Sequence, residues 1–228
     1  YHIHKALLVH HSEYFRKALT GPSKGAQEGV VNLEDVEPDK FVLVNIFVHW
    51  LYTQSLPPCT EWDRMVDTVN DRSLLKMKAY AFADRFLVPE LRRMVNNSFV
   101  AFTDLGCAAA LLCYTQEAYA TIPVDRPILQ LLVDAHCERW TPCVEVHLPN
   151  MLAEYPHAFV VRALRRMHEK LLRTMRGLPE KWPRCYYEHA SEEEKYTCRV
   201  WHREYDHEKG YGFFGTRYTC VTCAEDGA

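Results

Sequence analysis

Residues 74–99 read LLKMKAYAFADRFLVPELRRMVNNSF, and this stretch contains two helical patterns separated by a break. In the first pattern apolar residues recur every three or four positions, which is the spacing of one helix face. These residues are Leu75, Ala79, Phe82 and Phe86. Val88-Pro89 interrupts the pattern because proline lacks an amide hydrogen and restricts the residue before it. A second helix carries Leu91, Val95 and Phe99. The stretch predicts a helical pair that begins near Ser73, a suitable N-cap.

Upstream, residues 41–52 read FVLVNIFVHWLY and are apolar almost all round. Such a helix is expected in the middle of a domain, with no polar side to place in water. It falls short of the roughly 18 apolar residues that a membrane span needs. Pro38 suits the first helical turn, and SLPPCTEW (residues 55–62) ends the helix.

The remaining patterns predict a mixed domain followed by helices alone. Residues 1–3 and 29–33 are β-prone and predict two short strands, while residues 4–19 have helical spacing up to Gly21-Pro22. Residues 107–119, 127–140 and 157–175 show only helical spacing. The order predicts an α+β, mostly helical fold with an all-helical extension.

Three segments in register resemble the fungal branch of the BTB/POZ family. They are HKALLVHHSEYF (4–15), VNLEDVEPDKF (31–41) leading to WLYTQSL (50–56), and the stretch quoted above. The resemblance implies a small sheet flanked by helical hairpins over residues 1–101, a helical extension over 102–176 and a separate tail over 177–228. The residues that carry it, with structural or interface roles implied, are His4, Lys5, Leu8, Ser12, Tyr14, Phe15, Asp35, Phe41, Trp50, Tyr52 and Asp84.

The family implies a protein–protein interaction module that forms homo-oligomers or hetero-oligomers, as a scaffold or adaptor in ubiquitination or transcriptional regulation. Two departures qualify this. The family's first strand, often exchanged between subunits, has no counterpart, so we expect an N-terminally truncated domain with an unpaired sheet edge. Related chains carry a bulky apolar residue at Ser23 and an acid at Gly25, a pattern that helps cullin adaptors bind the ligase. Its loss here disfavours a cullin-type ligase as partner.

The tail begins at Gly177-Leu178-Pro179, where aliphatic residues give way to aromatics. It contains two C-x3-H pairs and one C-x2-C pair, and short paired spacings suit tetrahedral zinc. The preferred ligands for this structural zinc are Cys185, His189, Cys220 and Cys223, with Cys198 and His202 as competitors. The alternative is a partly disordered tail, or an aromatic-rich strap packed on the helical domain. No other cofactor is implied.

A basic run covers residues 162–184 and can be interpreted in two ways. Its cations are Arg162, Arg165, Arg166, Lys170, Arg173, Arg176, Lys181 and Arg184. One interpretation is a solvated helix face whose apolar side is formed by Val160, Leu164, Met167 and Leu171. The other is a phosphate-binding helix in a nucleic-acid-binding regulator, assisted by a zinc-stabilised tail. We favour the first, so nucleic acid is disfavoured as a partner.

Composition and the absence of known motifs disfavour several other classes of protein function. The 228 residues carry a net charge of −3, so no chain-wide field attracts nucleic acid or membrane. Cysteines scattered through apolar sequence, such as Cys113 and Cys137, predict buried free thiols in an intracellular protein. No GxSxG, P-loop or HExxH motif is present, and adjacent His136 and Cys137 would diverge on a helix, so we expect no enzyme. The opening histidines, His2, His4, His10 and His11, lack a nearby Cys or Asp, which favours structural roles over metal binding.

Overall fold

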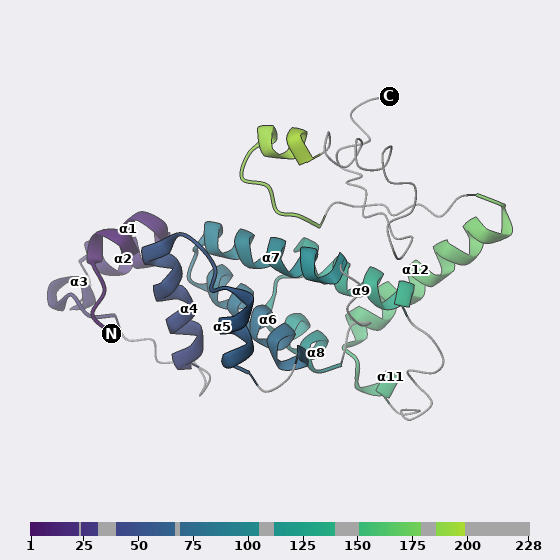
Figure 1. Ribbon diagram of the computed structural model, residues 1–228, viewed down its shortest axis with the longest axis horizontal. Helices are drawn as coiled ribbons and strands as arrows, with labels where there is room; N and C mark the ends of the chain where they lie inside the picture. The colour runs from purple at the N-terminus through teal and green to yellow at the C-terminus, as the bar shows by residue number, and fades with distance from the viewer. Residues whose placement is uncertain are drawn as a thin grey trace. The chain divides into compact units, whose positions relative to one another are not determined.

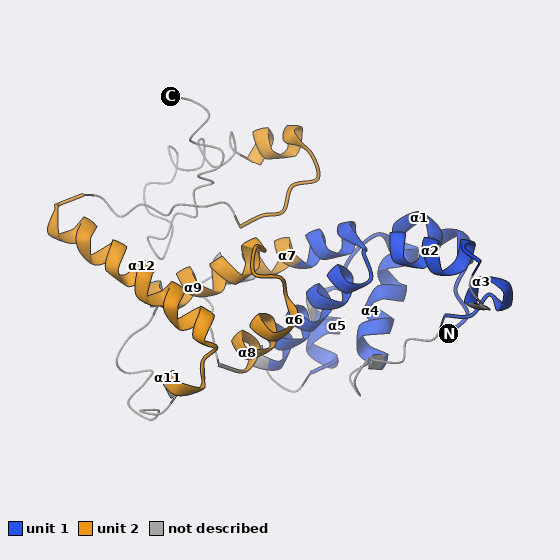
Figure 2. Cartoon of the chain, turned by 180° about the vertical axis from the view of Figure 1, so that it is seen from behind, with its two compact units in different colours: residues 1–95 blue, residues 96–228 orange. Residues whose placement is uncertain are grey.

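The computed structural model describes residues 1–22, 24–31, 40–66, 69–104, 112–139, 151–178 and 186–198 (Figure 1). The chain divides into two compact units, residues 1–95 and 96–228, which Figure 2 colours separately. All regular secondary structure in the described ranges is helical, so the prediction of a mostly helical chain is confirmed.

Unit 1 begins with two short helices where the sequence predicts one. α1 (Lys5–His11) and α2 (Glu13–Thr20) are separated by Ser12, whose backbone is extended at φ −135° and ψ 123°. The Ser12 hydroxyl accepts a hydrogen bond from the Phe15 amide at 3.0 Å and donates one to the Phe86 carbonyl at 2.6 Å. The predicted single helix is wrong because Ser12 caps α2 and at the same time ties it to a distant chain segment. A short α3 (Lys24–Glu28) follows.

Aromatic side chains form the core of unit 1. The Phe15 ring of α2 stacks on Phe47 of α4 (Lys40–Thr53) and on Phe86, with centroids 5.7 Å apart in both pairs. Phe86 follows α6 (Val69–Arg85), and its ring lies 4.5 Å from that of Phe82. Trp50 is fully buried in the same unit. Each such aromatic pair contributes about 0.5–1.5 kcal/mol beyond its buried area.

α4 is not buried on all sides, contrary to the expectation for residues 41–52. Four of its core residues are at most 2% exposed, namely Ile46, Phe47, Trp50 and Leu51. Phe41 near one end of the helix is 71% exposed, and Tyr52 near the other end is 48% exposed. The apolar composition of the helix therefore reflects two surfaces, one facing the core and one facing solvent.

The helices after α4 start earlier than predicted. α5 (Cys59–Arg64) begins inside the segment expected only to end α4, and it buries Trp62, whose indole N–H donates to the Pro57 carbonyl at 2.8 Å. α6 begins at Val69, so Ser73 lies inside the helix and is buried instead of capping it.

The predicted break at Val88-Pro89 is confirmed. α6 ends at Arg85, and α7 (Pro89–Asp104) starts with the proline. The turn is a Schellman motif, in which the Val88 amide donates to the Ala83 carbonyl at 2.8 Å. Leu87 occupies its left-handed position at φ 51°, where glycine is the usual residue.

The two predicted strands are not formed in the described part of the chain. Residues 1–4 and 30–31 are irregular, Gly29 is in a turn, and residues 32–33 lie outside the described ranges together with Asp35 and Pro38. An isolated strand is unstable because its backbone groups need a partner strand, and none of the described segments supplies one. The small sheet implied by the family resemblance stays a prediction.

Unit 2 is built around α9 (Pro127–Arg139), whose bounds match the predicted helix to within one residue. Nearly every residue from Ile128 to Cys137 is buried. α9 packs against α12 (His157–Met175) and against α8 (Leu112–Thr121), while α11 (Met151–Glu154) is a single turn. α12 has the predicted bounds of residues 157–175. Of the described thiols in unit 2, Cys137 is buried and in no disulfide, as predicted, whereas Cys113 is exposed, contrary to the prediction.

Candidate interaction surface and docked tail

The first four residues lie along the solvent-facing side of α4. The Tyr1 hydroxyl donates a hydrogen bond to Asn45 Oδ1 at 2.7 Å. Two turns further along α4, the Tyr52 hydroxyl accepts a hydrogen bond from the His4 amide at 3.3 Å and lies 2.7 Å from His4 Nδ1. The segment that the sequence predicts as a strand is therefore held by side chains of a helix.

These contacts leave aromatic surface in water. Tyr1 is 66% exposed, and Phe41 and Tyr52 remain exposed although both lie on the helix that supplies much of the core. Phe41, Asn45 and Tyr52 are four and seven positions apart, so they share one face of α4. We call Tyr1, His4, Phe41, Asn45 and Tyr52 the α4 surface.

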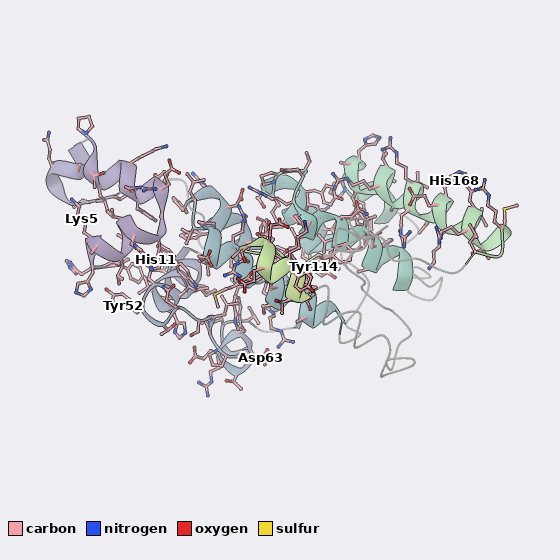
Figure 3. All side chains as sticks on the ribbon, turned by 90° about the horizontal axis from the view of Figure 1, so that it is seen from above. Lys5, His11, Tyr52, Asp63, Tyr114 and His168 are labelled. Carbon is pink, nitrogen blue, oxygen red and sulfur yellow. The ribbon has the colours of Figure 1, made fainter. Side chains whose placement is uncertain are left out.

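The opening histidines separate into two environments. His11 packs edge-on against Trp50, with ring centroids 5.1 Å apart, and His10 lies beside it at 4.6 Å. Burial lowers the pKa of His11, the neighbouring His10 lowers it further, and Glu90 opposes both. Figure 3 labels His11 and Tyr52, which lie at the same end of unit 1. Within the described ranges, no group of three or more His, Cys, Asp or Glu side chains is arranged to hold a metal ion.

The residues that carry the family resemblance have different positions in unit 1. Some are buried, some form polar pairs and some face solvent. Asp84, for example, forms an ion pair with Arg92 at 2.8 Å. Buried positions are Ser12, Phe15 and Trp50, half-buried positions are Leu8 and Asp84, exposed positions are His4, Lys5, Tyr14, Phe41 and Tyr52, and Asp35 lies outside the described ranges.

In unit 2 the beginning of the tail docks on α7. The buried Asn96 side chain donates to the Tyr186 carbonyl at 2.6 Å. The Asn97 side chain donates to the Glu188 carbonyl at 3.2 Å and accepts from the Glu188 amide at 2.9 Å. Two adjacent asparagines thus bind the backbone of the tail, as a neighbouring β-strand would. Of the alternatives open from sequence, this supports a strap packed on the helical unit for residues 186–188.

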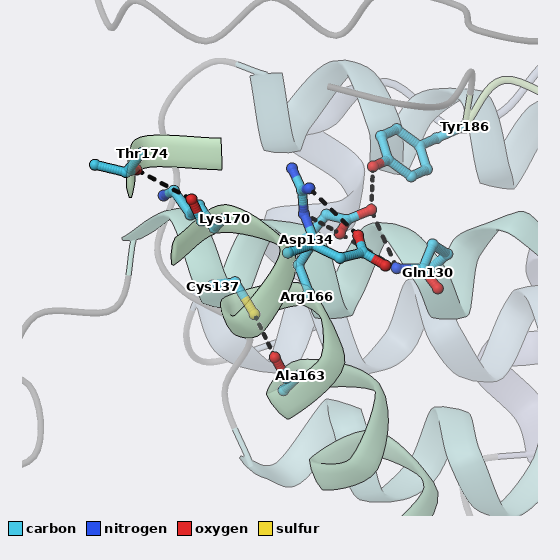
Figure 4. A network of polar contacts seen from close by, with 9 residues as sticks. Gln130, Asp134, Cys137, Ala163, Arg166, Lys170, Thr174 and Tyr186 are labelled. Atoms are coloured by element: carbon cyan, nitrogen blue, oxygen red, sulfur yellow. Dashed lines mark hydrogen bonds and ion pairs between the residues drawn. The ribbon is translucent and has the colours of Figure 1, made fainter. Parts of the chain in front are cut away.

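The Tyr186 side chain enters a buried polar network, shown in Figure 4. Its hydroxyl donates to the carboxylate of Asp134, which is fully buried on α9. Arg166 Nε of α12 lies 3.0 Å from the other carboxylate oxygen, and Gln130 Nε2 lies 3.2 Å from both oxygens. A buried carboxylate is tolerated only when paired and hydrogen-bonded, and here these contacts join α9, α12 and the tail.

This network was not predicted from the sequence, although the position of Asp134 in the sequence indicates it. Asp134 interrupts the apolar run PILQLLVDAHC on a helix whose residues from Ile128 to Cys137 are nearly all buried, and such a position requires a cationic or hydrogen-bonding partner. What the pattern could not supply was the identity of that partner, because Arg166 and Tyr186 lie far along the chain.

Two cations of the basic run are engaged inside the protein. Arg166 pairs with Asp134, and Arg162 donates to the Val124 carbonyl at 2.7 Å while lying 5.8 Å from the Tyr119 ring centroid. Lys181 and Arg184 lie outside the described residues. These contacts do not support the nucleic-acid interpretation, because two of the cations that would bind phosphates interact with other groups of the protein instead.

The zinc ligands preferred from sequence fall mostly beyond the described residues. Cys185, Cys220 and Cys223 lie outside them, as does His202. His189 is half-buried beside the docked segment, and Cys198 is a half-buried thiol, in no disulfide, at the end of a helical segment over residues 192–198. The zinc site therefore stays a prediction.

The exposed aromatic residues of unit 1 are typical of a binding module. Residues 1–100 match the BTB/POZ domain family. The chain therefore carries a BTB/POZ domain, a protein–protein interaction module of a family that is generally non-enzymatic. No curated protein and no solved structure matches the chain. Among the described helices, none is long and apolar enough to cross a membrane.

Proposed function

We propose that this chain self-associates through its BTB/POZ domain and that the α4 surface forms the contact between copies. The observation that carries the proposal is Phe41, which is 71% exposed on a helix whose opposite side is core. Exposed aromatic residues next to hydrogen-bonding groups are typical of the residues that dominate interface energies. A dimer of ordinary size would bury on the order of 1,600 Å² in total.

The finer role that we propose is that of a scaffold or adaptor, which brings partner proteins together in ubiquitination or transcriptional regulation. Gly25 occupies the position where the resemblance expects an acid in cullin adaptors, and it lies within α3. Without that acid and without an apolar residue at Ser23, we rank a cullin-type ligase below other protein partners. Stoichiometric capture of a cullin by the chain would reverse this ranking.

Self-association is tested by measuring molar mass against concentration for the full chain, using light scattering or sedimentation. We expect a dimer for the unchanged chain and at least about tenfold weaker association for Phe41→Asp. Val124→Asp is the matched control, because Val124 is 65% exposed but belongs to unit 2. An unchanged dimer in Phe41→Asp, or equal weakening by both variants, would show that the α4 surface is not the contact.

We also propose that Cys185, His189, Cys220 and Cys223 bind a structural zinc ion. The support is the paired C-x3-H and C-x2-C spacing, together with the hydrogen bonds that hold the Glu188 backbone, one residue before His189. Zinc content of the full chain purified without chelator should approach one equivalent and fall in Cys220→Ser. Less than about a tenth of an equivalent would reject the site.

A further inference from the structure

α12 is rotated relative to the orientation that its sequence predicts. Its buried residues are Phe159, Ala163 and Arg166, whereas Leu164 is 62% exposed and Leu171 is 58% exposed. The apolar side predicted from the sequence, which includes Leu164 and Leu171, therefore faces solvent at these two positions. An arginine takes the place against the core that a leucine was expected to fill.

The exposed apolar residues continue beyond Leu171 in one line. Met175 is 75% exposed, and Leu178, just after the helix, is 48% exposed. Leu164, Leu171 and Met175 are spaced by seven and four positions, which places them on one side of α12, and Leu178 follows in the turn after the helix ends. We call Leu164, Leu171, Met175 and Leu178 the α12 stripe. The exposed His168, labelled in Figure 3, lies on the same side between Leu164 and Leu171.

Packing against the described residues of unit 2 does not account for the α12 stripe. All the buried residues of α12 lie at or before Arg166, so the helix from Met167 to Met175 has no buried side chain. Contacts to α9 in the first half of the helix include the hydrogen bond from the Cys137 thiol to the Ala163 carbonyl at 3.6 Å and the Arg166–Asp134 ion pair. A sustained line of exposed apolar residues that the described part of the chain does not cover marks an interaction surface.

The charge around the α12 stripe indicates the chemistry of its partner. α12 contains five Arg or Lys residues and one acidic residue, Glu169. Arg165 and Arg176 are exposed on one flank of the stripe, and the half-buried Lys170 lies on the other. A second copy of the chain would place like charges against each other, whereas an acidic partner would be attracted. Phosphate binding would use the cations but would leave the leucines unexplained.

We propose that the α12 stripe binds an acidic amphipathic helix of a partner protein. Apolar residues of the partner helix would cover Leu164, Leu171 and Met175, and its flanking carboxylates would face Arg165 and Arg176. The site lies in unit 2 and is separate from the BTB/POZ domain. It gives the helical extension a binding function that is independent of self-association.

The test uses the full chain and a designed fluorescent peptide, an amphipathic helix with leucines on one face and glutamates on the others. Anisotropy should show binding that weakens about tenfold or more in Leu171→Asp, because one buried leucine is worth roughly 1.5–3 kcal/mol. Arg165→Glu with Arg176→Glu should weaken binding and reduce its salt dependence. Ala158→Asp is the matched control on the same helix, since Ala158 is exposed but lies off the stripe.

Several results would overturn the proposal. One is equal binding of a peptide in which lysines replace the glutamates, and another is unchanged binding by Leu171→Asp with native circular dichroism. Self-association that Leu171→Asp abolishes would assign the stripe to a second copy. Binding of a DNA duplex that the Arg165 and Arg176 changes weaken, but Leu171→Asp does not, would assign α12 to nucleic acid.

Discussion

Replacing Ser12 with alanine should destabilise unit 1 by about 2 kcal/mol. Ser12 is only 1% exposed, and its hydroxyl makes two hydrogen bonds. The hydroxyl accepts one from the Phe15 amide at 3.0 Å and donates one to the Phe86 carbonyl at 2.6 Å. Loss of the helix cap costs about 1 kcal/mol. A buried carbonyl left without its partner costs roughly another 1–3 kcal/mol. The lower part of this range applies if the carbonyl regains another partner after relaxation.

The assay is urea unfolding of the full chain followed by circular dichroism, with hydrogen exchange of the peptide that covers α2. Ser12→Ala should lower the free energy of unfolding and should speed amide exchange in Glu13–Thr20. Thr20→Ala is the matched control, because the Thr20 hydroxyl makes an exposed bond to the Arg16 carbonyl at 2.6 Å and its loss should cost less than about 0.5 kcal/mol. Equal stability of the two variants would refute the cap.

Further predictions concern the turns, the tail and the pH dependence. Leu87→Gly should raise the midpoint of thermal unfolding, and Gly177→Ala should lower it. Both residues occupy the left-handed position of equivalent helix-ending turns, at φ 51° and 63°, where glycine is the most favourable residue. Shifts in the opposite directions would contradict this left-handed geometry. Asn97→Ala should release the tail, seen as faster exchange at Glu188 or faster proteolysis, and unchanged protection would argue against docking. The NMR titration midpoint of His11 should lie below its ordinary 6.5, so stability should fall as the pH drops from 6.5 toward that midpoint. In His11→Gln this part of the pH dependence should vanish; a midpoint above 6.5 would be inconsistent with the packing on Trp50.

The helices that sequence predicts best are those whose ends are marked by local chemistry. α9 starts at Pro127, α12 follows Pro156, and the break before α7 is set by Pro89. Proline acts on its own backbone and on the residue before it, so its effect is visible without knowledge of the fold. These boundaries were predictable for that reason.

The break at Ser12 is different in kind. The apolar residues on both sides of it keep helical spacing, so periodicity predicts one helix. Ser12 ends that helix because its hydroxyl is bonded to Phe86, 74 positions away. The docking of Glu188 on Asn97, 91 positions apart, is equally non-local. Neither contact can be read from a window of neighbouring residues.

The orientation of α12 shows why a recognisable amphipathic pattern does not specify which side faces the core. Asp134 is fully buried on α9, and a buried carboxylate without a partner would be strongly destabilising. Arg166 meets this requirement at 3.0 Å, so that side of α12 must face α9. Residues two positions apart on a helix differ by about 200° around its axis, so turning Arg166 inward turns Leu164 outward. The same ion pair that joins the two helices thus presents the α12 stripe to solvent, and the binding surface that we propose is a direct consequence of satisfying one buried charge.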